Sequence, residues 1–91
     1  MVSMFPTLIN DLYPGLDVNI YPNPTDGILY FDGEDLEWDA RVEIVDLTGK
    51  VVMQNQLRGL RQVHLHQLNS GVYFVHVIQE NGRFSGKVVL E

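Results

Sequence analysis

Hydrophobic and polar residues alternate along most of the chain with a period of two, the spacing of a β-strand that has one face in a core. Seven short segments show this alternation or a brief apolar run, namely residues 18–21, 28–31, 41–46, 50–57, 62–66, 71–79 and 83–90. After residue 17, apolar residues do not recur at helical spacings of three and four over ten or more positions. The pattern predicts an all-β fold, an Ig-like antiparallel β-sandwich of about seven short strands.

The alternation also predicts which side chains each strand buries. Those expected to point into the core are Val42, Ile44, Val63, Leu65, Tyr73, Val75 and Val77. Those expected on outer faces include Phe74, His64, His66 and His76.

Turn-forming residues separate these segments. Pro22 and Pro24 end the first strand, because proline has no N–H to donate to a neighbouring strand. The residues that we expect to define turns, rather than to contact a partner, are Pro22, Asn23, Pro24, Gly27, Asp46, Gly49 and Lys50.

Two hairpins are predicted from shorter signals. Gly49 suits the left-handed position of a short loop, and Asp46 can accept hydrogen bonds from amides of its own turn. Asn81-Gly82 predicts a type I′ hairpin before the last strand. That strand is therefore expected to pair with the one before it.

Residues 1–17 follow a different pattern and are set apart from a domain at residues 18–91. Their apolar residues recur at spacings of one, three and four, a weakly helical pattern, and comprise Met4, Phe5, Leu8, Ile9, Leu12 and Tyr13. The segment is either a linker or a lead-in added by cloning, or a short helix that packs on the sandwich or on a neighbouring chain.

Composition narrows the function. The 91 residues suffice for one domain, and a net charge of −6 with six dispersed basic residues argues against nucleic acid or anionic lipid as the main partner. The absence of cysteine excludes disulfides and thiol chemistry. No apolar run approaches the roughly 20 residues that span a bilayer.

Three groups of residues suggest binding or catalysis, but each has a simpler explanation. Three imidazoles, His64, His66 and His76, could bind a metal if they converged, although outward strand positions are polar by default. Residues 32–39 carry five carboxylates but lack the order of a calcium loop, and a solvated loop explains them. Tyr30, Trp38 and Phe74 could form an aromatic platform for sugars, or simply pack in the fold. We therefore predict no catalytic residues, no metal site and no cofactor.

Four segments together point to one family. They are residues 18–27 (VNIYPNPTDG), 42–52 (VEIVDLTGKVV), 68–77 (LNSGVYFVHV) and 86–90 (GKVVL). In this order and spacing the chain resembles the type A C-terminal sorting domain of proteins that Bacteroidetes export through the type IX (Por) secretion system. The resemblance covers about residues 18–91.

The resemblance implies an Ig-like sandwich of seven strands that follows an N-terminal cargo and is recognised by the outer-membrane secretion machinery. It places the cargo in the medium or at the cell surface, reached through the periplasm. For many family members it also implies removal of the domain by a cell-surface sortase and attachment of the cargo to an anionic lipopolysaccharide.

The final strand, residues 83–90, is expected at or near a sheet edge, where a receptor can add a strand. The candidate recognition residues are Gly71, Tyr73, Gly86, Lys87, Val88, Val89 and Leu90. These residues could equally close the core, and edge strands also permit a homodimer. The alternative function is a carbohydrate- or surface-binding module of an extracellular enzyme, with a small metal-dependent enzyme ranked below it.

Overall fold

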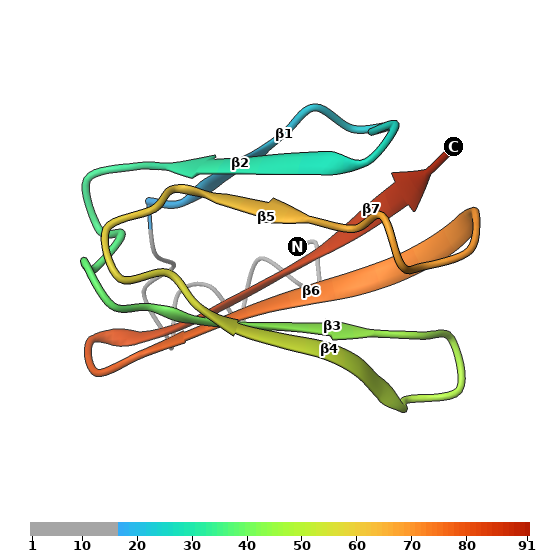
Figure 1. The fold of residues 1–91 in the computed structure, drawn as a ribbon. Coiled ribbons are helices and arrows are strands. Elements are labelled where there is room, and N and C mark those ends of the chain that lie inside the picture. Colours follow the sequence, from blue (N-terminus) through green and yellow to red (C-terminus); the bar gives the residue numbers. More distant parts are fainter. Residues whose placement is uncertain (1–16) are drawn as a thin grey trace, which may run out of the picture.

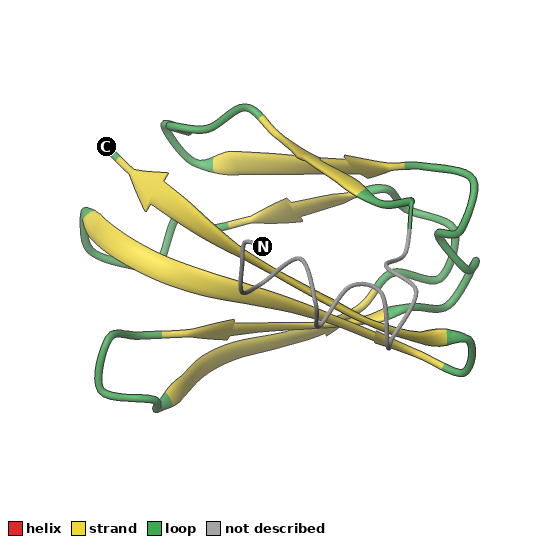
Figure 2. Cartoon of the chain, turned by 180° about the vertical axis from the view of Figure 1, so that it is seen from behind, coloured by secondary structure: helices red, strands yellow, loops and turns green. Residues whose placement is uncertain are grey.

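The computed structural model describes residues 17–91, which form seven strands and no helix (Figures 1 and 2). The strands are β1 Asn19–Tyr21, β2 Ile28–Asp32, β3 Arg41–Val45, β4 Val51–Gln56, β5 Gln62–His64, β6 Gly71–Gln79 and β7 Gly82–Leu90. The predicted all-β class and the seven strands are confirmed. The helix or linker predicted before residue 17 lies outside the described residues.

The strands form two stacked antiparallel sheets, one with the order β1-β2-β5 and the other with the order β4-β3-β6-β7 (Figure 1). The longest pairing joins β6 to β7, from Gly71 opposite Leu90 to Gln79 opposite Gly82. The predicted position of the last strand at a sheet edge is confirmed. The described part of the chain offers no helix of the length and apolarity that a membrane crossing needs.

The core fills the space between the two sheets. Leu29 and Phe31 of β2 face the other sheet, and each is at most 1% exposed. The aliphatic residues predicted to point inward are all buried, namely Val42, Ile44, Val63, Leu65, Val75 and Val77. Tyr73 is half-buried against the same cluster. Period-two alternation therefore predicted the buried faces correctly.

The β3–β4 hairpin is held by one carboxylate. Asp46 Oδ1 accepts hydrogen bonds from Thr48 N (2.9 Å), Thr48 Oγ1 (2.6 Å) and Lys50 N (3.1 Å). Gly49 has φ +91°, the left-handed conformation predicted for it. The hydrogen bonds from Thr48 and Lys50 lower the pKa of Asp46 from its ordinary value of 3.8.

The prediction of a type I′ turn at Asn81-Gly82 is wrong. Gln79 lies opposite Gly82, so the loop consists of Glu80 and Asn81. A type I′ turn needs positive φ at both central residues, and within residues 17–91 Arg58 is the one non-glycine residue with positive φ. The Glu37 carboxylate accepts hydrogen bonds from the amides of Glu80 (3.2 Å) and Asn81 (3.1 Å). These contacts from another loop hold the connection in a different conformation.

The acidic segment is the loop between β2 and β3, as the simpler interpretation predicted. Asp17 packs on it: its amide donates to Asp35 Oδ2 (2.6 Å), and its carboxylate accepts from Glu34 N (3.2 Å). Gly33 permits this approach because it has φ +133° and a Cβ there would collide with the Asp17 carbonyl.

We expect Gly33→Ala to destabilise the domain more than Gly49→Ala. Both positions have positive φ, for which a side chain costs about 1–3 kcal/mol, but a Cβ at Gly49 meets no atom within 4 Å. Chemical denaturation of both variants measures the two losses in free energy of unfolding, and their difference reports the collision of the added Cβ with Asp17. Equal losses would show that this collision adds nothing to the cost.

We expect Asp46 to add a pH dependence to stability on the acid side. Because its pKa is lower in the folded chain than in the unfolded chain, its stabilisation is fully present above the unfolded pKa and is lost as pH falls through the folded pKa. The free energy of unfolding, measured by chemical denaturation, should therefore fall more steeply between about pH 6 and about pH 3 for the wild type than for Asp46→Asn. Asp26→Asn, at an exposed position outside this hairpin, should follow the wild type; parallel curves for the wild type and Asp46→Asn would contradict the assignment.

Candidate recognition surface

The segment around Asn23 lies along the outer edge of β7. Asn23 Nδ2 donates to the Lys87 carbonyl (2.8 Å), and the Val89 amide donates to Asn23 Oδ1 (3.0 Å). A side-chain amide has the same donor and acceptor as a peptide group. Asn23 therefore replaces a residue of a neighbouring strand, at a place where Pro22 and Pro24 have no N–H to offer.

Thr25 continues this contact with its backbone. Its amide donates to the Val89 carbonyl (2.9 Å), its carbonyl accepts from the Glu91 amide (2.8 Å), and it forms a parallel bridge with Leu90. The Thr25 side chain is buried, and its hydroxyl donates to the Ile28 carbonyl (2.6 Å) and accepts from the Gly27 amide (3.2 Å). The same residue thus fixes the β1–β2 turn and closes the sandwich at β7.

The candidate recognition residues gather around this contact. Gly71 lies opposite Leu90 and Tyr73 opposite Val88, so β6 supports the end of β7 from its other side. The Tyr73 hydroxyl donates to the Asn69 carbonyl (2.6 Å). Val88 and Leu90 are buried in the core, whereas Lys87 is exposed and Val89 half-buried on the outer face.

Most of the turn-defining residues lie at this end as well. The β1–β2 turn, the β3–β4 hairpin loop and the start of β6 lie at the end of the sandwich where β7 terminates (Figure 1). The acidic β2–β3 loop and the β6–β7 turn lie at the opposite end (Figure 1). Each of the four segments that identify the family therefore has its turn or one of its ends at this end of the molecule.

Sequence analysis missed the contact between Asn23 and β7. It assigned residues 22–24 to a turn, which is correct, but did not connect them to a strand more than sixty positions away. The sequence does carry a signal for this contact. Because the two prolines have no N–H to donate, a polar side chain between them is the group that can bond to a strand.

The histidines do not converge. The rings of His64 and His66 lie 5.3 Å apart, near β5 of the three-stranded sheet. His76 belongs to β6 of the other sheet, where Nδ1 lies 2.7 Å from Ser85 Oγ. A metal site would need His76 on a strand beside that of His64 and His66, but it belongs to the other sheet, because alternation places a residue on an outer face and does not say of which sheet. Within residues 17–91, no three potential metal-ligating side chains are grouped.

The three aromatic residues do not share a surface either. Tyr30 stacks on Tyr21 on the outside of the three-stranded sheet, with ring centroids 5.8 Å apart. Phe74 is on the outside of the four-stranded sheet, and Trp38, 69% exposed, is on the β2–β3 loop. The Tyr21 hydroxyl donates to Asp32 Oδ2 (3.1 Å), and this hydrogen bond raises the pKa of Tyr21. The sugar-binding platform, and with it the alternative function, is not supported.

Comparison with known proteins identifies the family of the chain. No protein with a curated description matches the chain. The sequence model of the secretion system C-terminal sorting domain matches residues 19–91, which is nearly all of the β-sandwich. The chain belongs to the secretion system C-terminal sorting domain family.

Proposed function

We propose that the secretion machinery recognises the end of the sandwich at which β7 terminates. Domains of this family are C-terminal sorting signals for type IX secretion, which exports proteins across the outer membrane to the cell surface or the medium. The family is one of sorting signals rather than of enzymes. In our proposal the domain performs no catalysis, and its role is to present this end to the machinery behind an N-terminal cargo.

The observation that carries the proposal is the hydrogen bonding of residues 23–25 to β7. Lys87, whose carbonyl accepts the hydrogen bond from Asn23, is exposed, and so are Pro22, Asn23 and Pro24. Residues from both ends of the domain therefore contribute to one surface, which exists only once the sandwich has folded. A surface of this kind is the same whatever cargo precedes it.

The same contact limits how a receptor can bind β7. The Lys87 carbonyl, both backbone groups of Val89 and the Glu91 amide are already bonded to residues 23–25. We propose that a receptor contacts side chains at this half of β7, chiefly Lys87 and Val89. Strand addition remains open toward the start of β7, where the backbone groups of Arg83 and Ser85 point the same way without a described partner strand.

We further propose that, where a cell-surface sortase removes the domain, it cuts before Val18. Val18 is 5% exposed and packs in the core, so cleavage at or after it would require unfolding. Proteolysis favours exposed segments with few buried contacts.

We expect Asn23→Ala to loosen the end of β7. The variant loses two hydrogen bonds, and a loss of about 1–2 kcal/mol would speed local exchange roughly tenfold. Hydrogen exchange followed by NMR should show faster exchange at Val89 and Glu91, and no change in β3 or β4. Asn19→Ala is the matched control, because the described hydrogen bond of that side chain is to the Asp32 side chain, away from β7. Unchanged exchange at Val89 would contradict the role given to Asn23.

Export then tests whether this end is what the machinery recognises. A reporter fused in front of residues 1–91 should reach the surface or medium of a type IX-competent bacterium. Deletion of Gly86 to Glu91 should leave it in the periplasm, and Asn23→Ala should lower export while Asn19→Ala does not. Export of the deletion at the wild-type level would refute the proposal.

A further inference from the structure

The four edge strands of the sandwich are protected to different degrees. The strands β1 and β5 have three residues each, and the end of β7 is covered by residues 23–25. The strand β4 is six residues long and reads VVMQNQ, with no charge, no proline and no glycine. Natural sheets usually protect a long edge with charged residues, prolines or bulges, since an open edge can pair with another chain. A register shift opposite Ile44 and Val45 leaves Val52 as a bulge, so the unprotected part of the β4 edge is residues 53–56.

A groove runs between β4 and β5, where the edges of the two sheets separate. Its volume is about 540 Å³, within the roughly 300–1,000 Å³ of typical ligand sites. Its lining combines apolar residues, among them Met53, Leu57 and Val63, with amide residues, among them Asn55, Gln62 and Gln67. Although the chain has a net charge of −6, no Asp, Glu, Lys or Arg lines this groove.

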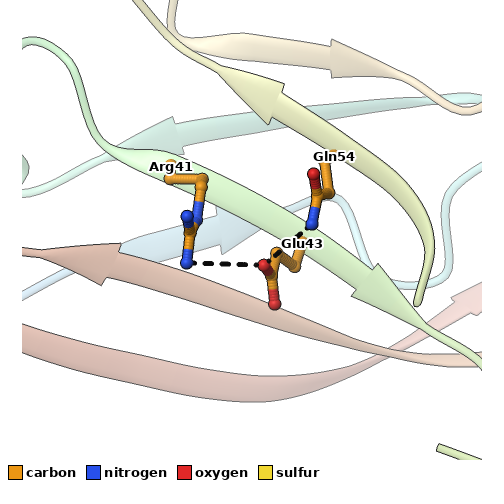
Figure 3. A network of polar contacts seen from close by, with 3 residues as sticks. All are labelled: Arg41, Glu43 and Gln54. Atoms are coloured by element: carbon orange, nitrogen blue, oxygen red, sulfur yellow. Dashed lines mark hydrogen bonds and ion pairs between the residues drawn. The ribbon is translucent and has the colours of Figure 1, made fainter. Parts of the chain in front are cut away.

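The side chains of β4 are divided between the groove and the outer face. Met53 pairs with Ile44 and Asn55 with Val42, and since Ile44 and Val42 are fully buried, Met53 and Asn55 lie on the inner side. Gln54 lies on the outer face, where its Nε2 donates to Glu43 Oε2 (3.1 Å), and Arg41 Nη2 lies 3.5 Å from the same oxygen (Figure 3). These two charged residues of β3 are therefore paired with each other on the outer face and stay out of the groove.

We propose that β4 accepts an extended, uncharged segment of another protein as an added fifth strand of its sheet. The outward N–H and C=O groups of β4 would bond the backbone of this segment, and uncharged side chains at alternate positions would enter the groove. The neutral lining sets the chemistry of the partner: a carboxylate or an ammonium group placed there would lose its hydration without gaining a counter-ion. Leu60, 66% exposed, offers an apolar contact at the β4–β5 connection.

The test uses the whole chain and a capped, uncharged heptapeptide of alternating threonine and valine. At about ten times its Kd, the peptide should slow hydrogen exchange of the outward β4 amides about tenfold, and leave β7 unchanged. A control peptide with lysine in place of the valines should have no effect. Asn55→Lys, which puts a charge in the groove, should abolish the protection. Leu47→Lys adds the same charge at an exposed apolar residue of the adjoining hairpin loop, and should leave it intact.

Other results would overturn the proposal. Saturating peptide with no protection of β4, or protection that survives Asn55→Lys, would exclude the groove. Light scattering that shows a concentration-dependent dimer, lost in Asn55→Lys, would identify a second copy of this chain as the occupant instead. If Asn55→Lys does not fold, Leu60→Ser provides the same test, since it shortens an exposed side chain; unchanged peptide affinity in that variant would count against the groove.

Discussion

The hydrogen bonds from Asn23 and Thr25 to β7 hold together the end of the sandwich at which β7 terminates. A terminal strand at a sheet edge is paired on one side and tends to fray. Here residues 87–90 pair with β6 on one side and are bonded by residues 23–25 on the other, and the Glu91 amide adds a bond to Thr25. Each such bond contributes only about 1 kcal/mol net, but together they tie β7 to the turn that leads into the other sheet. The sandwich is closed along this side as a result.

This closure brings together segments of the family pattern that are far apart in sequence. The segment at 22–27 supplies the partner of β7, the segment at 86–90 is β7 itself, and Gly71 and Tyr73 support it from β6. Alternation then divides the last strand: Val88 and Leu90 anchor the core, and Lys87 and Val89 are left at the surface. In our proposal, residues on one face of this strand stabilise the core and their neighbours on the other face contact the machinery.

Much of the fold could be predicted from the sequence, because burial on a strand repeats every second residue and turn residues interrupt it. What alternation cannot determine is which sheet a strand joins, so His76 and Phe74 were grouped with residues of the other sheet. Local turn preferences also failed at Asn81, where the Glu37 carboxylate of a distant loop holds both loop amides. The role of Asn23 was missed for the same reason, since its partners are 64 and 66 residues away. In each case a long-range contact decided the outcome.

The order β4-β3-β6-β7 places the two proposed contact regions on opposite edges of one sheet. Two intervening strands separate them, so a partner on β4 neither covers β7 nor competes with residues 23–25 for its backbone. The chemistry of the two edges also differs, because β7 presents an exposed lysine beside prolines, whereas β4 presents a neutral groove. The two proposed partners would therefore bind the same sheet without sharing a strand or a hydrogen-bonding edge.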